Sequence, residues 1–512
     1  MLIKTFGSAC YGINATTITI EVDASPGFGF CMVGLPDSAV KESQQRINTA
    51  LQTIGFRMPG RKVVINMAPA DIRKEGSAYD LPLALGLLAA SEQIKADKIA
   101  DFVIMGELSL DGHLRPITGA LPIALQAHRE NFKGLILPKE NAREAGIVEA
   151  LNVYGVETLR EVIDFFNGES ELQPLKVNIH EEFQQLSTDF DVDFSDVKGQ
   201  DNVKRAMEIA AAGGHNIIMI GPPGSGKTML AKRLPTIIPP LSLQEALETT
   251  KIHSVAGKID KNTGLVAKRP FRAPHHTISN VGLVGGGSNP QPGEISLAHN
   301  GVLFLDELPE FQRTVLEVMR QPLEDRSITV SRARYSIEYP ANFMLVASMN
   351  PCPCGNYNHP EKPCLCASGV VQKYLSKISG PLIDRIDIHI EVVPVPFAQL
   401  SEIKPAESSA AIRERVIATR KIQEQRFKFE PHIHCNAMMP SRLLKKYCKL
   451  DEACTALLKT AVDQVGLSAR AYDRILKVAR TIADLGHEAH IKPDHVSEAI
   501  NYRNLDREGW AG

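Results

Sequence analysis

The sequence predicts an α/β protein built on a parallel sheet that is flanked by helices. Three short apolar runs carry this prediction, because each is long enough for one buried strand and each ends in a different polar group. The runs are Ile217–Ile220, Gly301–Leu305 and Phe343–Met349. The first leads into a glycine-rich turn, the second into two acids and the third into an asparagine. We expect these runs to form strands of one sheet.

The first run opens a phosphate-binding motif. It is followed by G-x-x-x-x-G-K-T and then by helix-prone residues from Met229, which is the order strand, loop, helix. Glycines let the backbone N–H groups turn inward onto phosphate oxygens, and the helix N-terminus adds partial positive charge. Lys227 would reach the β- and γ-phosphates, and the Thr228 hydroxyl would ligate Mg²⁺. The predicted ATP- and Mg²⁺-binding residues are Gly221, Pro222, Pro223, Gly224, Ser225, Gly226, Lys227 and Thr228.

Polar residues elsewhere in the chain complete the predicted catalytic set. We assign Asp306 to Mg²⁺ and Glu307 to the general base that polarises the attacking water. Asn350 would hydrogen-bond the γ-phosphate, with a strand-end cap as the structural alternative. Arg385 is an always-charged fork donor that would enter a neighbouring subunit's site, and Arg470, in the first turn of an amphipathic helix, would face nucleotide phosphate. The full set is Lys227, Asp306, Glu307, Asn350, Arg385 and Arg470.

Composition limits the class of protein. Hydrophobic residues make up 44% of the 512 residues, and no apolar run approaches the about 20 residues of a membrane helix. Met1–Thr5 leads directly into patterned sequence, so we expect no signal peptide. Nine cysteines, an odd number, do not resemble a secreted disulfide framework, so we expect a cytoplasmic protein without a membrane partner. With a net charge of −2, any DNA contact must come from a local patch.

Residues 1–170 are predicted to form a separate α/β domain. Their strands and helices alternate, and the segments 68–80 and 106–119 resemble the proteolytic domain of Lon protease. That domain hydrolyses peptides with a Ser–Lys dyad. The family's serine falls on Ala78 and its lysine on Leu121, and leucine cannot deprotonate a hydroxyl. The resemblance therefore implies a retained scaffold and not a protease.

The rest of the chain divides into three parts. We predict an acidic linker at 171–195, an ATPase core at 196–397 and a helical C-terminal lid at 398–512. Two insertions interrupt the core, one at Ile278–Ser296 and one at Ser327–Pro340; the second alternates on both sides of a turn and predicts a β-hairpin. In the lid, Arg474 lies one turn beyond Arg470, where we expect an ordinary surface pair.

These elements, in this order, resemble an AAA+ ATPase, and more closely its magnesium-chelatase-like branch, which also holds the MCM helicases. The insertions match that branch's helix-2 insertion and its hairpin before the Asn350 strand. In related helicases such a hairpin lines the central pore, so the resemblance implies that Arg332 and Arg334 at its tip meet DNA phosphates. A solvated turn is the alternative.

With the Lon-like domain added, the pattern is similar to the bacterial ComM family, also called YifB-type, across nearly the whole chain. That resemblance implies a hexameric DNA helicase that supports branch migration of incoming DNA in natural transformation. Two other functions stay open. One is a motor subunit of a magnesium chelatase, and the other is a protein-remodelling scaffold derived from a Lon-like peptidase.

Four of the nine cysteines form a cluster directly after Asn350. Two C-x-C pairs, separated by nine residues, could fold back as a tetrahedral S₄ site for structural Zn²⁺. The spacing is tighter than the usual C-x₂-C, so a reversible disulfide and free thiols in a loop are alternatives. The cluster consists of Cys352, Cys354, Cys364 and Cys366.

Overall fold

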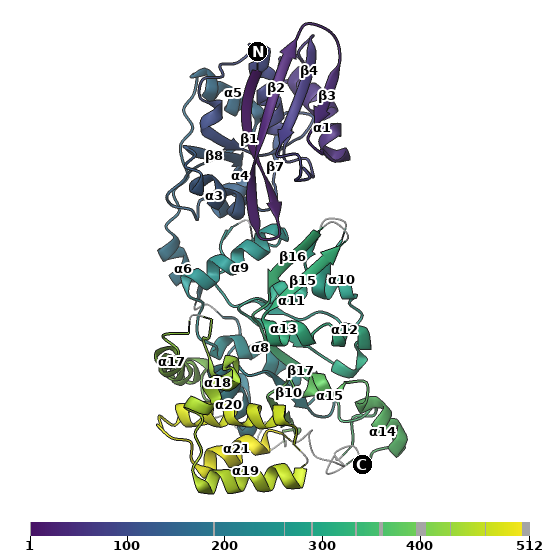
Figure 1. Ribbon diagram of the computed structural model, residues 1–512, viewed down its shortest axis with the longest axis vertical. Helices are drawn as coiled ribbons and strands as arrows, with labels where there is room; N and C mark the ends of the chain where they lie inside the picture. The colour runs from purple at the N-terminus through teal and green to yellow at the C-terminus, as the bar shows by residue number, and fades with distance from the viewer. Residues whose placement is uncertain are drawn as a thin grey trace. The chain divides into compact units, whose positions relative to one another are not determined.

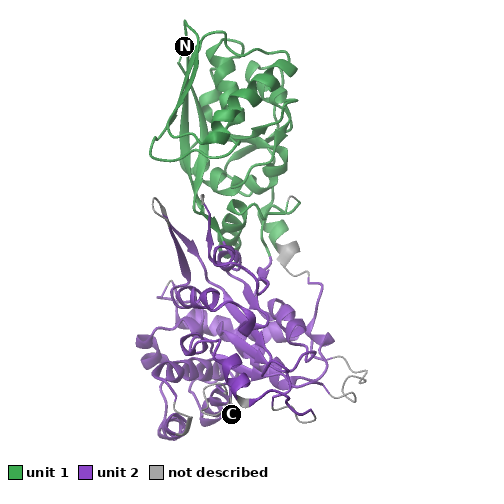
Figure 2. Cartoon of the chain, turned by 90° about the vertical axis from the view of Figure 1, so that its right-hand side faces the viewer, with its two compact units in different colours: residues 1–187, 242–267, 290–292 green, residues 188–241, 268–289, 293–512 purple. Residues whose placement is uncertain are grey.

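The computed structural model describes residues 2–187, 190–260, 262–287, 290–332, 335–357, 362–395, 406–430, 432–465 and 467–503 (Figure 1). The chain divides into two compact units, shown in Figure 2. Unit 1 comprises residues 1–187, 242–267 and 290–292, and unit 2 comprises 188–241, 268–289 and 293–512. This division differs from the sequence-based boundaries, because part of the segment expected in the ATPase core belongs to unit 1. The segment expected as a linker also contains a helix, α6 (Ile179–Ser187).

Unit 1 is built on a seven-stranded mixed sheet in the order β3-β4-β2-β1-β5-β8-β9. Strands β1 and β2 form an antiparallel hairpin, β4 extends it in the antiparallel sense, and β5, β8 and β9 are parallel. The strands are β1 (Leu2–Tyr11), β2 (Asn14–Ser25), β3 (Phe30–Val33), β4 (Lys62–Ala68), β5 (Phe102–Ile104), β8 (Gly134–Pro138) and β9 (Asn152–Val156). A small hairpin joins β6 (Glu107–Leu108) to β7 (Leu114–Arg115). The combination of strands and helices expected in this region is confirmed.

Helices α2 and α3 pack against this sheet, and helices and strands together form the apolar core of unit 1. Every residue of α2 is buried, as its all-round apolar sequence requires. The helices are α1 (Ser38–Thr53), α2 (Asp80–Ala90), α3 (Ala120–Arg129), α4 (Lys139–Ala145) and α5 (Leu159–Asn167).

Helix α9 (Leu243–Val255), which lies in the range predicted for the ATPase core, packs against α3 within unit 1. The Gly119 N–H donates to the Ser254 carbonyl at 3.2 Å, and the Ser254 hydroxyl donates to the Glu144 carboxylate. The same carboxylate accepts the Leu121 N–H at 2.9 Å. Burial raises the pKa of Glu144. Leu121, at the position of the Lon lysine, is thus fully buried and contributes only its backbone to this polar cluster.

Unit 2 contains the predicted parallel sheet, in the order β11-β14-β17-β10-β18. All residues of β10, β14 and β17 are buried, which explains their unbroken apolar sequences. The strands are β10 (Ile217–Ile220), β11 (Phe271–Arg272), β14 (Val302–Leu305), β17 (Met344–Met349) and β18 (Ile388–Glu391). Helix α7 (Asp201–Gly213) precedes β10, and α8 (Lys227–Ile237) follows it.

Both predicted insertions are described apart from short gaps, and they belong to unit 2 except for residues 290–292, which belong to unit 1. The hairpin pairs β15 (Ser327–Arg332) with β16 (Tyr335–Pro340), as the alternating sequence predicts. Arg334 lies outside the described residues, and only the backbone of Arg332 is described. The earlier insertion includes α10 (Asn280–Val284) and α11 (Glu294–Leu297). Shorter helices connect the strands: η3 (Leu308–Glu310), α12 (Arg313–Glu317), α13 (Arg320–Asp325), α14 (Ser368–Leu375) and α15 (Gly380–Ile383).

The C-terminal segment is helical, as expected, and shares one apolar core with the sheet of unit 2. Ile475 and Leu476 of the lid belong to the same buried cluster as Ile217 of β10 and Leu234 of α8. The lid helices are α17 (Ser409–Arg426), α18 (Ser441–Tyr447), α19 (Glu452–Val465), α20 (Ala469–Leu485) and α21 (Pro493–Asn501). Among the described residues, no helix is both long and apolar enough to cross a bilayer.

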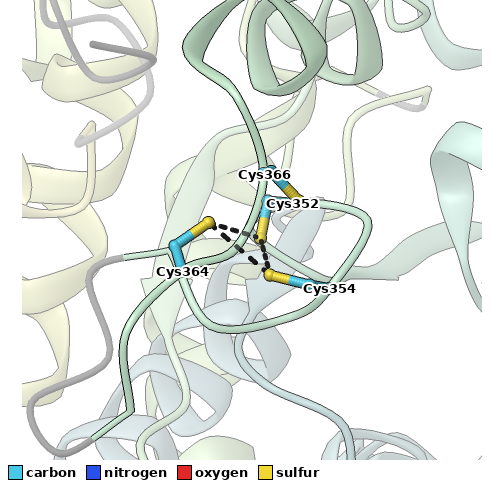
Figure 3. A group of neighbouring side chains, drawn as sticks. All are labelled: Cys352, Cys354, Cys364 and Cys366. Atoms are coloured by element: carbon cyan, nitrogen blue, oxygen red, sulfur yellow. Dashed lines mark hydrogen bonds between the residues drawn. The ribbon is translucent and has the colours of Figure 1, made fainter.

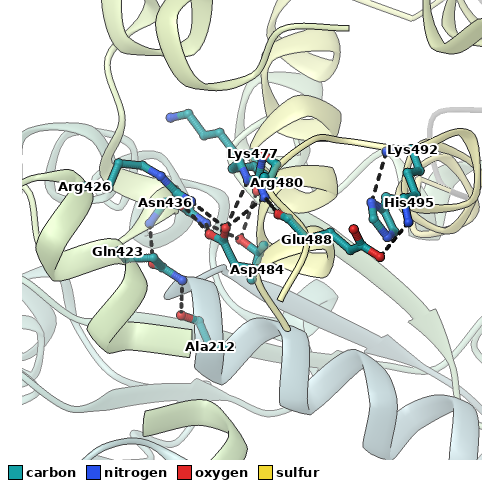
Figure 4. Close-up of polar contacts among 12 residues, drawn as sticks. Ala212, Gln423, Arg426, Asn436, Lys477, Arg480, Asp484, Glu488, Lys492 and His495 are labelled. Carbon is teal, nitrogen blue, oxygen red and sulfur yellow. Dashed lines mark hydrogen bonds and ion pairs between the residues drawn. The ribbon is translucent and has the colours of Figure 1, made fainter. Parts of the chain in front are cut away.

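A buried carboxylate organises the polar interior of the lid (Figure 4). The Asp484 side chain, 1% exposed, accepts hydrogen bonds from Arg426 at 2.5 and 2.6 Å, from Arg480 at 3.0 Å and from Asn436 at 2.8 Å. Gln423 continues this network to the end of α7, because its amide donates to the Ala212 carbonyl at 3.0 Å. The negative charge of Asp484 is therefore compensated within the interior, as a buried carboxylate requires.

Replacing Asp484 by asparagine should strongly destabilise unit 2. The substitution keeps the size of the side chain but leaves two buried guanidinium groups without their counter-charge, a loss of about 3–5 kcal/mol. Urea unfolding followed by circular dichroism measures it. Glu488→Gln is the matched control, since its ion pair with Lys492 is exposed and should leave the unfolding midpoint unchanged. Equal midpoints for both variants would contradict the assigned role of Asp484.

Candidate nucleotide-binding site

The glycine-rich loop between β10 and α8 has the conformation that its sequence requires. Gly224 and Gly226 have φ values of +78° and +90°, in the left-handed region that favours glycine. Gly221 is required for a different reason: a Cβ there would lie 2.2 Å from the Val392 carbonyl oxygen. The Gly221 N–H donates to the Met349 carbonyl at 3.2 Å, which joins the start of the loop to β17.

Lys227 connects the loop to the end of β17. Its Nζ donates to the carbonyl oxygens of Gly221 at 2.7 Å and Pro222 at 2.9 Å, and to Asn350 Oδ1 at 3.3 Å. Burial lowers the pKa of Lys227, while the carboxylates of Asp306 and Glu307 oppose this shift. The structure thus brings together an ammonium group and an amide that lie 123 residues apart in the chain.

The two residues predicted to hold Mg²⁺ are in direct contact. The Thr228 hydroxyl donates to Asp306 Oδ2 at 2.7 Å, and the Ser348 hydroxyl donates to the other carboxylate oxygen. A hydroxyl and a carboxylate at this separation are hard oxygen donors of the kind that Mg²⁺ prefers. The residues present therefore fit a magnesium ion bound beside the phosphate loop.

Glu307 follows Asp306 but points to a different partner. Its φ of +54° is unusual for a residue with a side chain, and its carboxylate lies 3.5 Å from Nδ1 of His276. The Glu307 side chain is 56% exposed, so water can reach it. No sequence pattern points to His276, because its contact with Glu307 depends on how the loop before α10 folds.

Arg385 and Arg470 are the predicted residues that the single chain does not bring to the loop. Arg385 is 9% exposed at its side chain, with Nη2 2.8 Å from a Glu324 carboxylate oxygen and Nη1 2.7 Å from the Pro381 carbonyl. Arg470 is exposed on the first turn of α20. Ser468 caps this helix, because its side chain accepts the Ala471 N–H at 3.1 Å.

The expectation that Arg474 makes an ordinary surface pair is wrong. Its Nη1 lies 3.0 Å from Asp387, whose side chain is 1% exposed. The Asp387 carboxylate also faces His215 Nδ1 at 3.2 Å and accepts the Asn216 N–H at 3.1 Å. Burial alone would raise the pKa of Asp387, but Arg474 and His215 hold it well below its usual range. The contacts of Asp387 with Arg474 and Asn216 link the lid to the start of β10. The Asn216 side-chain amide also donates a hydrogen bond to the Arg385 carbonyl at 3.1 Å.

The cysteine cluster gathers at one point (Figure 3). Cys352 Sγ lies 3.3 Å from Cys354 Sγ and 3.6 Å from Cys364 Sγ, and the latter two sulfurs are 3.5 Å apart. With Cys366, all four sulfurs lie within 4.8 Å of one another, and all four are free thiols. The residues present therefore fit one tetrahedrally coordinated metal ion.

The fold and the site together define an AAA+ ATPase core of the magnesium-chelatase type. Residues 193–400 match the family model described as magnesium chelatase, subunit ChlI, and residues 406–503 match its C-terminal model. Residues 20–141 match a further model described as subunit ChlI of Mg-chelatase.

Similarity to proteins over nearly the whole chain identifies the family within this class. The chain is 44% identical over 504 residues to competence protein ComM of Haemophilus influenzae, covering 98% of this chain and 97% of that protein. It is also 44% identical to YifB of Escherichia coli, covering 98% of this chain and 96% of that protein. The chain belongs to the ComM/YifB family. Its N-terminal part is 30% identical over 148 residues to Lon protease 2 of Bacillus subtilis, which covers 28% of this chain and 26% of that protein.

Substituting Gly221 by alanine should disrupt the nucleotide site. The added methyl group would displace the Val392 backbone, at a cost of about 1–3 kcal/mol for overpacking. We expect a lower unfolding midpoint and weaker binding of a fluorescent ATP analogue. Gly380→Ala is the control, because no atom lies within 4 Å of the added carbon there. Native-like nucleotide affinity in Gly221→Ala would contradict the role assigned to this close approach.

Proposed function

We propose that this chain is an ATP-driven, ring-forming motor that acts on DNA as a helicase or branch-migration enzyme. The direct contact between Thr228 and Asp306, at the end of the phosphate loop, is the observation that carries the ATPase part. Similarity over nearly the full length to a protein named for competence supports the DNA part. Hexamer formation and a role in recombination of incoming DNA complete the proposal.

The site residues have distinct roles in this mechanism. Mg²⁺, when bound, neutralises charge on the β- and γ-phosphate oxygens. Thr228 and Asp306, which are in direct contact, would hold that ion, and Lys227 would bind the phosphates from the loop. Glu307, exposed to water, accepts the proton of the attacking water molecule, and Asn350 orients that water or the γ-phosphate.

Arg385 is proposed to act on the nucleotide of a neighbouring subunit, and Arg470, on the helical lid, is proposed to face nucleotide phosphate. In one chain, Arg385 is paired with Glu324, so a role in trans requires that pair to open. The negative charge of a triphosphate in the adjoining subunit would compete with the Glu324 carboxylate for the guanidinium group. Ring closure and hydrolysis would then depend on each other.

Three further parts of the proposal concern features outside the nucleotide site. The unit resembling Lon is proposed to be non-proteolytic, because the position of the family's lysine carries the buried Leu121. The cysteine cluster is proposed to bind a structural Zn²⁺, since its four sulfurs lie close enough to share one ion. The hairpin arginines Arg332 and Arg334 remain the proposed DNA contacts.

Hydrolysis of ATP with and without forked DNA tests the proposal as a whole. We expect DNA to stimulate the rate and Glu307→Gln to reduce it by about 10²–10⁴-fold while nucleotide binding is retained. Light scattering on the same sample measures the oligomer. Hydrolysis that forked DNA does not change would contradict the DNA role and favour a chelatase-type or protein-remodelling motor.

Arg385→Ala should abolish turnover but preserve nucleotide binding, because the guanidinium group acts only when charge develops on the neighbour's phosphate. Steady-state hydrolysis and titration with a fluorescent ATP analogue separate the two effects. Glu324→Gln is the matched variant, since it removes the partner but keeps the arginine, and it should retain activity. An unchanged hydrolysis rate in Arg385→Ala would remove the trans role.

A further inference from the structure

The cysteine cluster lies against the phosphate loop, and this contact indicates a role beyond stabilising the segment that carries the cysteines. We propose that a zinc ion bound by Cys352, Cys354, Cys364 and Cys366 holds the phosphate loop in its nucleotide-binding position. This inference rests on the ATP site proposed above and adds a dependence of that site on a metal.

The geometry of the cluster suits a single ion. A zinc ion with Zn–S bonds of about 2.3 Å spaces its four sulfurs by roughly 3.8 Å. The three measured sulfur separations, 3.3, 3.5 and 3.6 Å, are near this value. A multi-iron cluster would hold its cysteine sulfurs farther apart, and thiolate ligands favour zinc over magnesium or calcium.

Backbone N–H groups surround the sulfurs as they do in metal-binding turns. The N–H groups of Asn356 and Leu365 face Cys354 Sγ, and the N–H group of Cys366 faces Cys364 Sγ. Thiolates bound to a metal ion commonly accept hydrogen bonds of this kind from the surrounding backbone. The site is therefore supported by its surroundings as well as by four converging sulfurs.

The first connection to the phosphate loop is a steric contact. Gly355 closes a turn by donating its N–H to the Cys352 carbonyl at 3.0 Å, and its φ is +79°. A Cβ at Gly355 would lie 2.4 Å from Cδ of Pro223, a residue of the phosphate loop. The turn that begins at the first ligand, Cys352, and ends at Gly355 thus rests directly on the loop, without room for a side chain at Gly355.

The second connection passes through Asn350, which precedes Cys352 by two residues. Its side chain accepts the hydrogen bond from Lys227 at 3.3 Å, and its backbone N–H faces the hydroxyl oxygen of Tyr374. Tyr374 is on α14, which begins two residues after Cys366. The metal-binding segment therefore starts two residues after Asn350 and leads into the helix whose Tyr374 contacts Asn350.

A metal ion would fix both connections at once. Metal binding supplies folding free energy to the segment that carries the ligands, because those ligands do not converge in its unfolded form. Without the ion, the turn at Gly355 and the start of α14 are no longer held together by cysteines that bind the same ion. The phosphate loop then loses its support at Pro223 and Asn350, and we expect nucleotide affinity to fall about tenfold, within the usual range for coupled sites.

Zinc removal from the full-length protein tests this coupling. Mass spectrometry should find one zinc ion per chain, and titration with a fluorescent ATP analogue should show affinity about tenfold lower after chelation. Adding zinc alone should restore it. If the zinc-free protein binds the analogue as tightly as the zinc-loaded protein, the coupling is wrong. If the zinc-loaded protein does not bind it at all, the proposed ATP site is wrong instead.

Two pairs of variants separate metal binding from the contact with the loop. Gly355→Ala should keep its zinc but lose nucleotide affinity, whereas Gly369→Ala, with no atom within 4 Å of the added carbon, should keep both. Cys364→Ser should lose zinc and affinity together, whereas Cys31→Ser, which changes an exposed thiol elsewhere, should lose neither. Native affinity in a zinc-loaded, folded Gly355→Ala protein would overturn the proposed contact. A full complement of zinc in Cys364→Ser would overturn the metal site.

Discussion

The register of the parallel sheet in unit 2 is the constraint on which the nucleotide site depends. Ile220 of β10 pairs with Met349 of β17, and Leu305 of β14 pairs with Ala347 of β17. The three strands therefore end at nearly the same level, which is where ligands bind in open α/β sheets. A shift of one strand would separate Thr228 from Asp306, although each residue would keep its local structure.

Buried charge gives the lid a defined position on this sheet. Apolar packing between α20 and α7 tolerates small displacements, whereas a buried carboxylate such as Asp387 or Asp484 requires all its donors in place. Asp387 receives them from the lid through Arg474 and from the start of β10 through Asn216. The same carboxylate lies two residues from Arg385, so the lid, the phosphate-loop strand and the proposed trans arginine share one polar network.

The two units are connected by more than the segment around residue 187. The chain leaves unit 2 after α8 and enters unit 1 at α9, where the Ser254 hydroxyl donates a hydrogen bond to Glu144. A helix that begins at the phosphate loop is thus followed in sequence by a helix anchored in the unit that resembles Lon. This continuity gives the Lon-like unit a covalent connection to the nucleotide site that its sequence position alone does not suggest.

The sequence by itself determined the local elements of the nucleotide site. The motif from Gly221 to Thr228, the apolar strands and the acids after β14 each follow from residues close together in the chain, so pattern alone predicts them. Only the tertiary structure decided which distant groups meet: His276 with Glu307, Arg474 with Asp387, and α9 with α3. The sequence does not show whether the partner of a charged side chain is water or a buried carboxylate. The partner depends on long-range packing and on the cost of desolvating charge, and no local pattern records either of them.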